Sequence, residues 1–444
     1  MEETNTPAVA LVNAGFLEDA RTSASAKGMP GIRIVPETVP CESSVMEQIE
    51  AGVNAVMDSV IAALTRPLTA EEKSPQPVVE KPPRIVFQGN LKEANRFFYK
   101  RGWTDGQPVI PPTEEEVAEM LTGTDLPPDH LVAELGPRLG KATVERIAIN
   151  AVMAGALPTY MPLLIAGVQA LMDPKAAFGT YAISAGSWAP FWIMNGPIRN
   201  ELHVNGGSGA LSPGDIANAA IGRAIGLIIK NVGGIRKGIE DMGTLGNPGK
   251  YSLVIAENEE DNPWEPLHVE HGFNRDDNTI TVFFPNNSVQ VGPYGTDDAG
   301  ILRTVIYNLI PGRRKGRFLL ILIPSHAKTL AASGWTKKDI QAFIAEYGRV
   351  PADHLPSFWG GGIRDRERGL HKERVPMVAS DSVSVLDAEL IRVIVAGGAG
   401  ASIGAYIGGG AVDPGWVTKR VELPAHWDNL VKKYKDIVPM YVRY

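Results

Sequence analysis

Cysteine is almost absent from this sequence, whose 444 residues contain only Cys41. One thiol cannot form an internal disulfide, and one chain cannot build a cysteine-based zinc site from it. The sequence also lacks a Walker phosphate loop and a Gly-x-Ser-x-Gly elbow in a strand–turn–helix context. Whether Cys41 is reactive stays open, because a helix N-terminus lowers a thiol pKa whereas burial leaves a cysteine inert.

An excess of positive charge is lacking as well. The net charge of -7 argues against a nucleic-acid or anionic-membrane partner, since either would need a basic surface. No apolar stretch reaches the ~18 residues that span a bilayer, and the first residues are acidic where a signal peptide is basic. We therefore expect a cytoplasmic globular protein with no nucleic-acid and no membrane partner.

The first 66 residues predict a small α/β unit. Residues 8–14 are a short apolar run rich in β-branched residues, residues 32–35 predict a second strand, and residues 16–26 between them have helical character. A stripe of apolar residues from 45 to 64 predicts a further helix. The order is β-α-β-α, a partial Rossmann-like unit. Parallel strands normally lie in larger sheets covered on both faces, so residues 1–66 read as a half-domain.

The whole chain is predicted to be α/β. A linker is expected at residues 67–84, and a large mixed α+β domain that holds the active-site pocket at residues 85–444. The linker is rich in proline and charge, which favours an extended path. The predicted helices are 91–101, 114–121, 142–155, 159–172, 212–231 and 336–347. The predicted strands are 178–184, 191–195, 251–257, 279–284, 318–324 and 392–396.

Two regions in the first part of the large domain contain candidate site residues. The loop 103–108, which contains a glycine and a proline, also contains Trp103, Thr104 and Asp105. It reads with equal weight as a rigid connector capped by Asp105 or as a loop that presents Asp105 to a pocket. Glu145 and Asn150 are further candidates on the predicted helix 142–155.

A second group surrounds residues 257–271. Glu257 ends a predicted strand, and Glu265, His268 and His271 follow at spacings of three, which places them on one face of a helical turn. Such a set can hold a divalent metal, act as an acid/base pair or be a structural cluster, and these readings stay open. Pro266 allows only a first helical turn.

Glycine-rich loops supply the remaining candidates. Residues 391–410 predict a strand that runs into Gly398 and Gly400, where backbone N–H groups can surround an anion. The match to a dinucleotide fingerprint is weak, and a packing corner is the alternative. Asn195 and Asn205 begin two more glycine loops, and together these loops favour backbone-lined pockets.

Several long stretches resemble the UGSC-motif family, which is named for a Sec/Cys-Gly-Ser-Cys loop. Residues 28–36 (GMPGIRIVP) within 7–64 carry this resemblance for the half-domain. In the large domain it rests on 101–113 (RGWTDGQPVIPPT), 142–155 (ATVERIAINAVMAG), 247–251 (NPGKY) and 256–273 (AENEEDNPWEPLHVEHGF). The resemblance implies a thiol- or selenol-based redox site, yet the half that holds the reactive loop is not in this sequence.

These observations lead to three hypotheses. In the first, a small partner protein carries the missing half-domain and its Cys/Sec-Gly-Ser-Cys loop, and the hetero-oligomer acts on a small-molecule substrate. The catalytic candidates are then Asp105, Glu145, Glu257, His268 and His271, and the cofactor stays open between none and a divalent metal. The second is a metal- or acid/base-dependent lyase or hydrolase centred on Glu265, His268 and His271. The third is a noncatalytic scaffold subunit.

Overall fold

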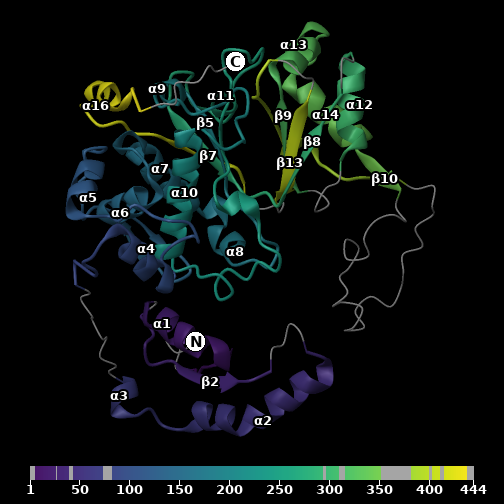
Figure 1. Ribbon diagram of the computed structural model, residues 1–444. Coiled ribbons are helices and arrows are strands. Elements are labelled where there is room, and N and C mark those ends of the chain that lie inside the picture. The colour runs from purple at the N-terminus through teal and green to yellow at the C-terminus, as the bar shows by residue number, and fades with distance from the viewer. Residues whose placement is uncertain are drawn as a thin grey trace.

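The structure is a computed structural model that describes residues 6–26, 28–39, 44–73, 83–293, 297–309, 316–351, 382–399, 403–410 and 415–437. Cys41 and Gly400 lie outside these residues. We call residues 6–73 the N-terminal piece and residues 83–437 the large body (Figure 1). The division into domains at residues 66 and 84 stays a prediction.

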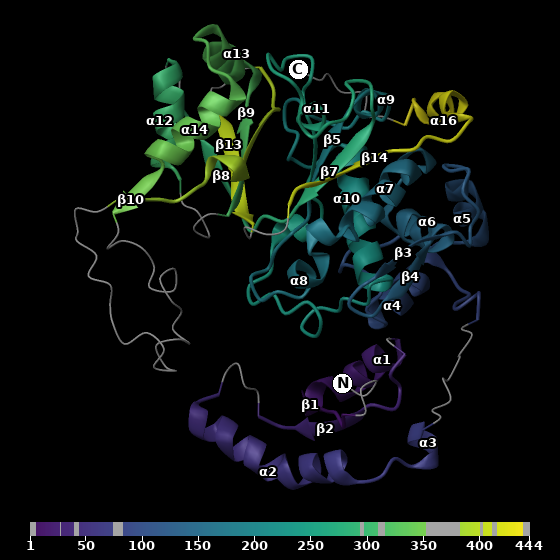
Figure 2. The same cartoon turned by 180° about the vertical axis from the view of Figure 1, so that it is seen from behind.

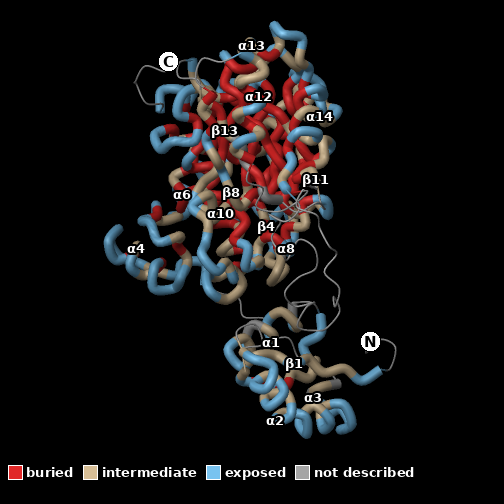
Figure 3. Tube along the Cα trace, turned by 90° about the vertical axis from the view of Figure 1, so that its right-hand side faces the viewer, coloured by how far each residue is buried: buried red, intermediate tan, exposed pale blue. Residues whose placement is uncertain are grey.

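The N-terminal piece has the predicted β-α-β-α order. Its two strands pair in parallel, with Val9 opposite Arg33 and Asn13 opposite Glu37. The second helix buries none of its residues, and Ile61 on it is 51% exposed. Figure 3 shows this piece almost without the buried positions that fill the large body. Its elements are β1 (Val9–Asn13), α1 (Leu17–Ala26), β2 (Arg33–Glu37), α2 (Met46–Thr65) and α3 (Ala70–Lys73).

The large body is built on two four-stranded sheets. The first has the order β14-β7-β5-β6 and the second β12-β9-β13-β8, and each contains one parallel pair. The strands of the first sheet are β5 (Phe191–Asn195), β6 (Val254–Ala256), β7 (Thr279–Phe283) and β14 (Val417–Arg420). Those of the second are β8 (Asn287–Val291), β9 (Arg317–Leu322), β12 (Ile391–Val395) and β13 (Gly404–Gly410).

The two sheets pack face to face because their strands are apolar on both sides. On β5, Phe191 and Ile193 join the cluster between the sheets, whereas Trp192 packs with the helices on the outer face. On β9, Leu319 lies between the sheets and Leu320 faces the other group of helices. Successive side chains of a strand point to opposite faces, so each of these buried strands contacts the other sheet on one face and helices on the other. The large body therefore has four layers, in the order helix–sheet–sheet–helix. Figure 2 shows the two sheets between the two helical groups.

Helices cover both outer faces. Against the first sheet lie α7 (Met161–Leu171) and α10 (Ile216–Asn231), and α6 (Val144–Ala154) packs against both of these helices. Against the second lie α12 (Asp298–Tyr307), α13 (Pro324–Ala332) and α14 (Lys337–Tyr347). Smaller elements are α4 (Leu91–Lys100), α5 (Glu114–Leu121), β3 (Leu131–Leu135), β4 (Gly140–Thr143), α8 (Phe178–Ala182), α9 (Ile198–Glu201), α11 (Leu267–Glu270), β10 (Arg349–Pro351), β11 (Ser382–Ser384) and α16 (Trp427–Tyr434).

Two sequence-based expectations are wrong. Residues 178–184 are not a strand, because α8 places Phe178 and Tyr181 one helical turn apart in the core. The glycines from Gly404 to Gly410 do not form a loop, because β13 pairs with β9 and β8. Across the described ranges, no helix has the length and apolar character that a membrane crossing requires.

Candidate functional site

The carboxyl ends of three strands meet at one edge of the two sheets. Asn195 ends β5, Glu257 follows β6, and Gly397 lies just beyond β12. The backbone N–H of Asn258 donates to the carbonyl of Val395 at 2.8 Å, which joins the ends of β6 and β12. Crevices at the carboxyl ends of parallel strands are the usual ligand sites of α/β sheets.

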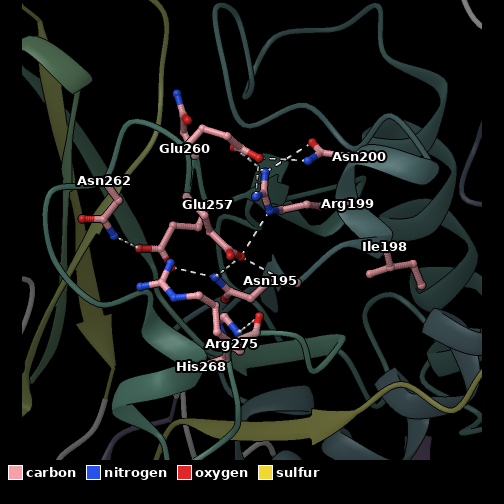
Figure 4. Close-up of polar contacts among 12 residues, drawn as sticks. Asn195, Ile198, Arg199, Asn200, Glu257, Glu260, Asn262, His268 and Arg275 are labelled. Carbon is pink, nitrogen blue, oxygen red and sulfur yellow. Dashed lines mark hydrogen bonds and ion pairs between the residues drawn. The ribbon is translucent and has the colours of Figure 1, made fainter.

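Glu257 is the fully buried centre of this edge. Its Oε2 accepts hydrogen bonds from Asn195 Nδ2 at 2.7 Å and from the backbone N–H of Leu267 at 2.8 Å. Its Oε1 accepts from Asn262 Nδ2 at 2.8 Å and lies 3.9 Å from Lys337 Nζ. Figure 4 shows Asn195 and Asn262 pointing toward this carboxylate. The side chain fixes the loop after β6 and has no oxygen left uncommitted.

Arg199 forms the second charged cluster of the edge. Its guanidinium lies 3.1 Å from Glu259 Oε1 through Nε, and two of its nitrogens contact the two oxygens of Glu260 at 2.7 and 2.9 Å (Figure 4). The hydrogen bonds from Arg199 hold the pKa of Glu260 at about 2. One guanidinium thus faces two carboxylates, so the cluster keeps an excess of negative charge, and it reaches solvent through Glu260, whose side chain is 59% exposed.

A polar cavity of about 580 Å³, which we call the strand-end pocket, opens beside these clusters. Asn205 on its wall donates to the carboxylate of Asp215 at 2.7 Å and to the carbonyl of Ser208 at 3.0 Å. Gly398 is needed here, because a Cβ on it would lie 2.6 Å from that of Ser208. Asn195, Asn205, Glu257 and Gly398 were all predicted site residues, and the structure brings them together.

The predicted set of Glu265, His268 and His271 does not gather into one site. His268 is fully buried, and its Nε2 lies 3.2 Å from the carbonyl oxygen of Arg275. Glu265 is exposed, and Lys337 contacts only its backbone carbonyl. Among the described residues, no three His, Cys, Asp or Glu side chains gather as metal ligands.

His271 lies in a different polar chain. Its Nδ1 contacts Thr418 Oγ1 at 2.7 Å, and its Nε2 accepts a 3.4 Å hydrogen bond from Arg392 Nε. An Nε2 that accepts leaves the proton on Nδ1, which then donates to Thr418. Burial, followed by repulsion from Arg392, lowers the pKa of His271 to about 4. The imidazole is therefore neutral at physiological pH.

A larger cavity, of about 970 Å³, lies on the outer side of α6. Residues 83–89, which we call the strap, form one wall, so we call this space the strap cavity. The opposite wall is one face of α6, with Arg146, Ile149, Asn150 and Met153 at helical spacing. A third wall comes from α4, through Leu91, Ala94 and Phe98.

Five predicted site residues lie in or beside the strap cavity. Trp103 and Asn150 line it directly. Asp105 is held by Arg223 through hydrogen bonds of 2.8 and 3.0 Å, which outweigh burial and lower its pKa. Thr104 is buried and accepts from the N–H of Gly106, and Glu145 accepts from Arg84. Asp105, Thr104 and Glu145 thus position the walls of the cavity rather than line it.

The sequence patterns missed the arginines and lysine of these sites. Arg199 and Glu260 are 61 positions apart, and Arg146 lies on a helix whose inner face reads as ordinary core. Lys337 begins a helix 80 positions after Glu257 but is 5% exposed. Such residues come together only when distant strands pair, so no local sequence pattern predicts their contacts.

The N-terminal segment matches a known family. Residues 1–66 match the model of the UGSC family, which confirms the resemblance for that segment. No curated protein and no solved structure matches the chain.

Proposed function

We propose that the large body holds a small organic substrate in the strap cavity, and that a partner protein supplies a reactive Cys/Sec-Gly-Ser-Cys loop to it. The partner completes the UGSC-like N-terminal piece. Its thiolate or selenolate then carries out redox or addition chemistry on the bound substrate. Residues 85–444 contain no cysteine, so the large domain has no thiol of its own for this chemistry.

The uncovered surface of the N-terminal piece supports a partner. Its described strands form a sheet of only two, and parallel sheets of that size are rarely stable unless further strands and helices cover them. Met57 and Ile61 on α2 are 39% and 51% exposed, and Leu11 on β1 is 44% exposed. Apolar side chains and unpaired strand edges together favour association with another sheet.

The path of the chain is the observation that carries the proposal. Pro83 and Arg84 line the strap cavity, and only residues 74–82 separate them from Lys73 at the end of α3. At ~3.3–3.6 Å for each residue, this connection spans at most about 36 Å. The N-terminal piece and whatever completes it are therefore tethered near the strap cavity.

A cross-linking experiment tests the proposal. The full chain, with Cys41→Ser, is co-expressed with a small protein carrying the first half of a UGSC domain and its Cys-Gly-Ser-Cys loop. Val86 lines the strap cavity and is 41% exposed, so Val86→Cys places a thiol at its wall. Under mild oxidation we expect a disulfide between this thiol and the partner's loop.

Tyr307→Cys is the matched control. Tyr307 is 90% exposed on α12, on the other side of the large body from α4 (Figures 1 and 2). Equal cross-linking at both positions, or no co-elution of the two proteins, would contradict the proposal. A stoichiometric metal in the purified chain would instead favour the metal-dependent hypothesis.

A further inference from the structure

The walls of the strap cavity have a distinct chemistry. Phe98 and Trp103 line it with their ring centroids 5.6 Å apart, and Phe87 on the strap adds a third ring. Ile149 and Met153 of α6 line the same space. Flat aromatic and aliphatic walls of this kind bind the apolar body of a ligand.

Arg146 is a cation on this apolar wall without a carboxylate partner among the residues that the structure describes. It is exposed, and its side chain donates to the carbonyl oxygen of Lys141 at 3.1 Å. Within the described part of the chain, no Asp or Glu oxygen forms an ion pair with it. Arg84, the other arginine of the lining, is by contrast bound by Glu114 at 2.8 Å and by Glu145 at 2.9 Å.

The polar groups on the inner wall are engaged with one another. Asn150 Nδ2 donates to the carbonyl of Arg146 at 2.9 Å, and Asn150 Oδ1 accepts from Asn231 Nδ2 at 2.8 Å. The same Asn231 nitrogen donates to the carbonyl of Trp103 at 3.0 Å. These bonds fix the position of the wall. The charged group that can still form an ion pair with a ligand is Arg146.

From these features we infer that the strap cavity takes a flat, mostly apolar monoanion, such as an aromatic carboxylate or sulfonate. The apolar body lies among the rings, and the anionic group lies at the mouth against the guanidinium of Arg146. Guanidinium and carboxylate match in plane and in paired hydrogen bonds, which favours this ligand over a phosphate-rich or cationic one. This inference rests on the proposed role of the cavity as the substrate site.

Two probes of equal shape test the inference on the full chain without any partner. The naphthalene rings of 2-naphthoate and 2-naphthamide are the same, and only the first is charged at pH 7. Displacement of 8-anilino-1-naphthalenesulfonate fluorescence measures both affinities. We expect the carboxylate to bind about three- to ten-fold more tightly, the range of a charge-assisted contact at a cavity mouth.

Arg146→Gln should abolish that preference while the amide binds as before. Arg96→Gln is the matched control, because Arg96 is an exposed arginine of α4 outside the cavity lining. Ala94→Leu, which fills the space beside Phe98, should weaken both probes without changing their ratio. Equal binding of the two probes, or a preference that survives Arg146→Gln, would overturn the inference. Such a result leaves the cross-linking test of the proposed function unaffected, so the two failures are distinguishable.

Discussion

Glu257→Gln should destabilise the large body far more than its conservative character suggests. Both oxygens of the buried carboxylate accept N–H groups, from Asn195 and Leu267 on one side and from Asn262 on the other. An amide has one acceptor, so its NH2 group must face at least one donor. The change loses a hydrogen bond to a charged group, worth ~1.5–3 kcal/mol, and leaves a buried donor unpaired, at a cost of ~1–3 kcal/mol.

These terms overlap, and a net loss of about 3 kcal/mol is expected. Glu260→Gln is the matched change three positions away, where the side chain is 59% exposed and a loss below about 1 kcal/mol is expected. Thermal unfolding by differential scanning calorimetry compares the two variants. Amide hydrogen exchange at Leu267 gives a local measure, because that N–H should exchange faster only in Glu257→Gln. Equal melting temperatures for the two variants would refute this account of the buried carboxylate.

Three further changes have defined outcomes. Burial opposes ionisation of Glu240, yet hydrogen bonds from Arg236 and Arg138 hold its pKa at about 2 against an ordinary 4.5. Its stabilising effect is present above pH 4.5 and lost toward pH 2, so Glu240→Gln should lower the melting temperature at pH 6 but little at pH 2.5. Burial lowers the pKa of His271 from 6.5 to about 4. Lowering the pH from 6.5 to 4 should therefore destabilise the fold, because the unfolded chain binds the proton first. His271→Asn should flatten this part of the pH profile of the melting temperature. Gly398→Ala should lower the melting temperature, because overpacking costs ~1–3 kcal/mol of the free energy of unfolding. Unchanged stability would contradict the close approach at that glycine.

Helices and strands were predicted best where burial alone determines the pattern of apolar residues. Residues 191–194 are an unbroken apolar run after Pro190, and together with Asn195 they form β5. Residues 178–184 look similar, but α8 begins at a left-handed Ala177 and buries Phe178 by a helical turn. β13 was missed because glycine has low strand propensity, and its place between β9 and β8 depends on distant partners.

Sequence reasoning located two candidates at the strand-end edge because a polar residue there ends or follows a strand, and their role as site residues stays a prediction. Asn195 and Glu257 could be found in this way, because strand ends of one sheet lie at a common edge. His268 and His271 share a spacing that suggested a common function, yet their rings contact different elements. A helical spacing places two Cβ atoms on one face but does not decide which buried groups their polar atoms reach.

The two cavities differ in how many of their lining groups are free to interact with a ligand. In the strand-end pocket the charges are committed, since Arg199 is bound by two carboxylates and Asn205 by Asp215. A ligand group that displaces these contacts exchanges one set of hydrogen bonds for another, which yields little net free energy. In the strap cavity, apolar rings and Arg146 meet solvent, and each Å² of apolar surface that a ligand covers contributes ~25 cal/mol. We therefore expect ligand binding at the strap, on the same residues that lead into the linker.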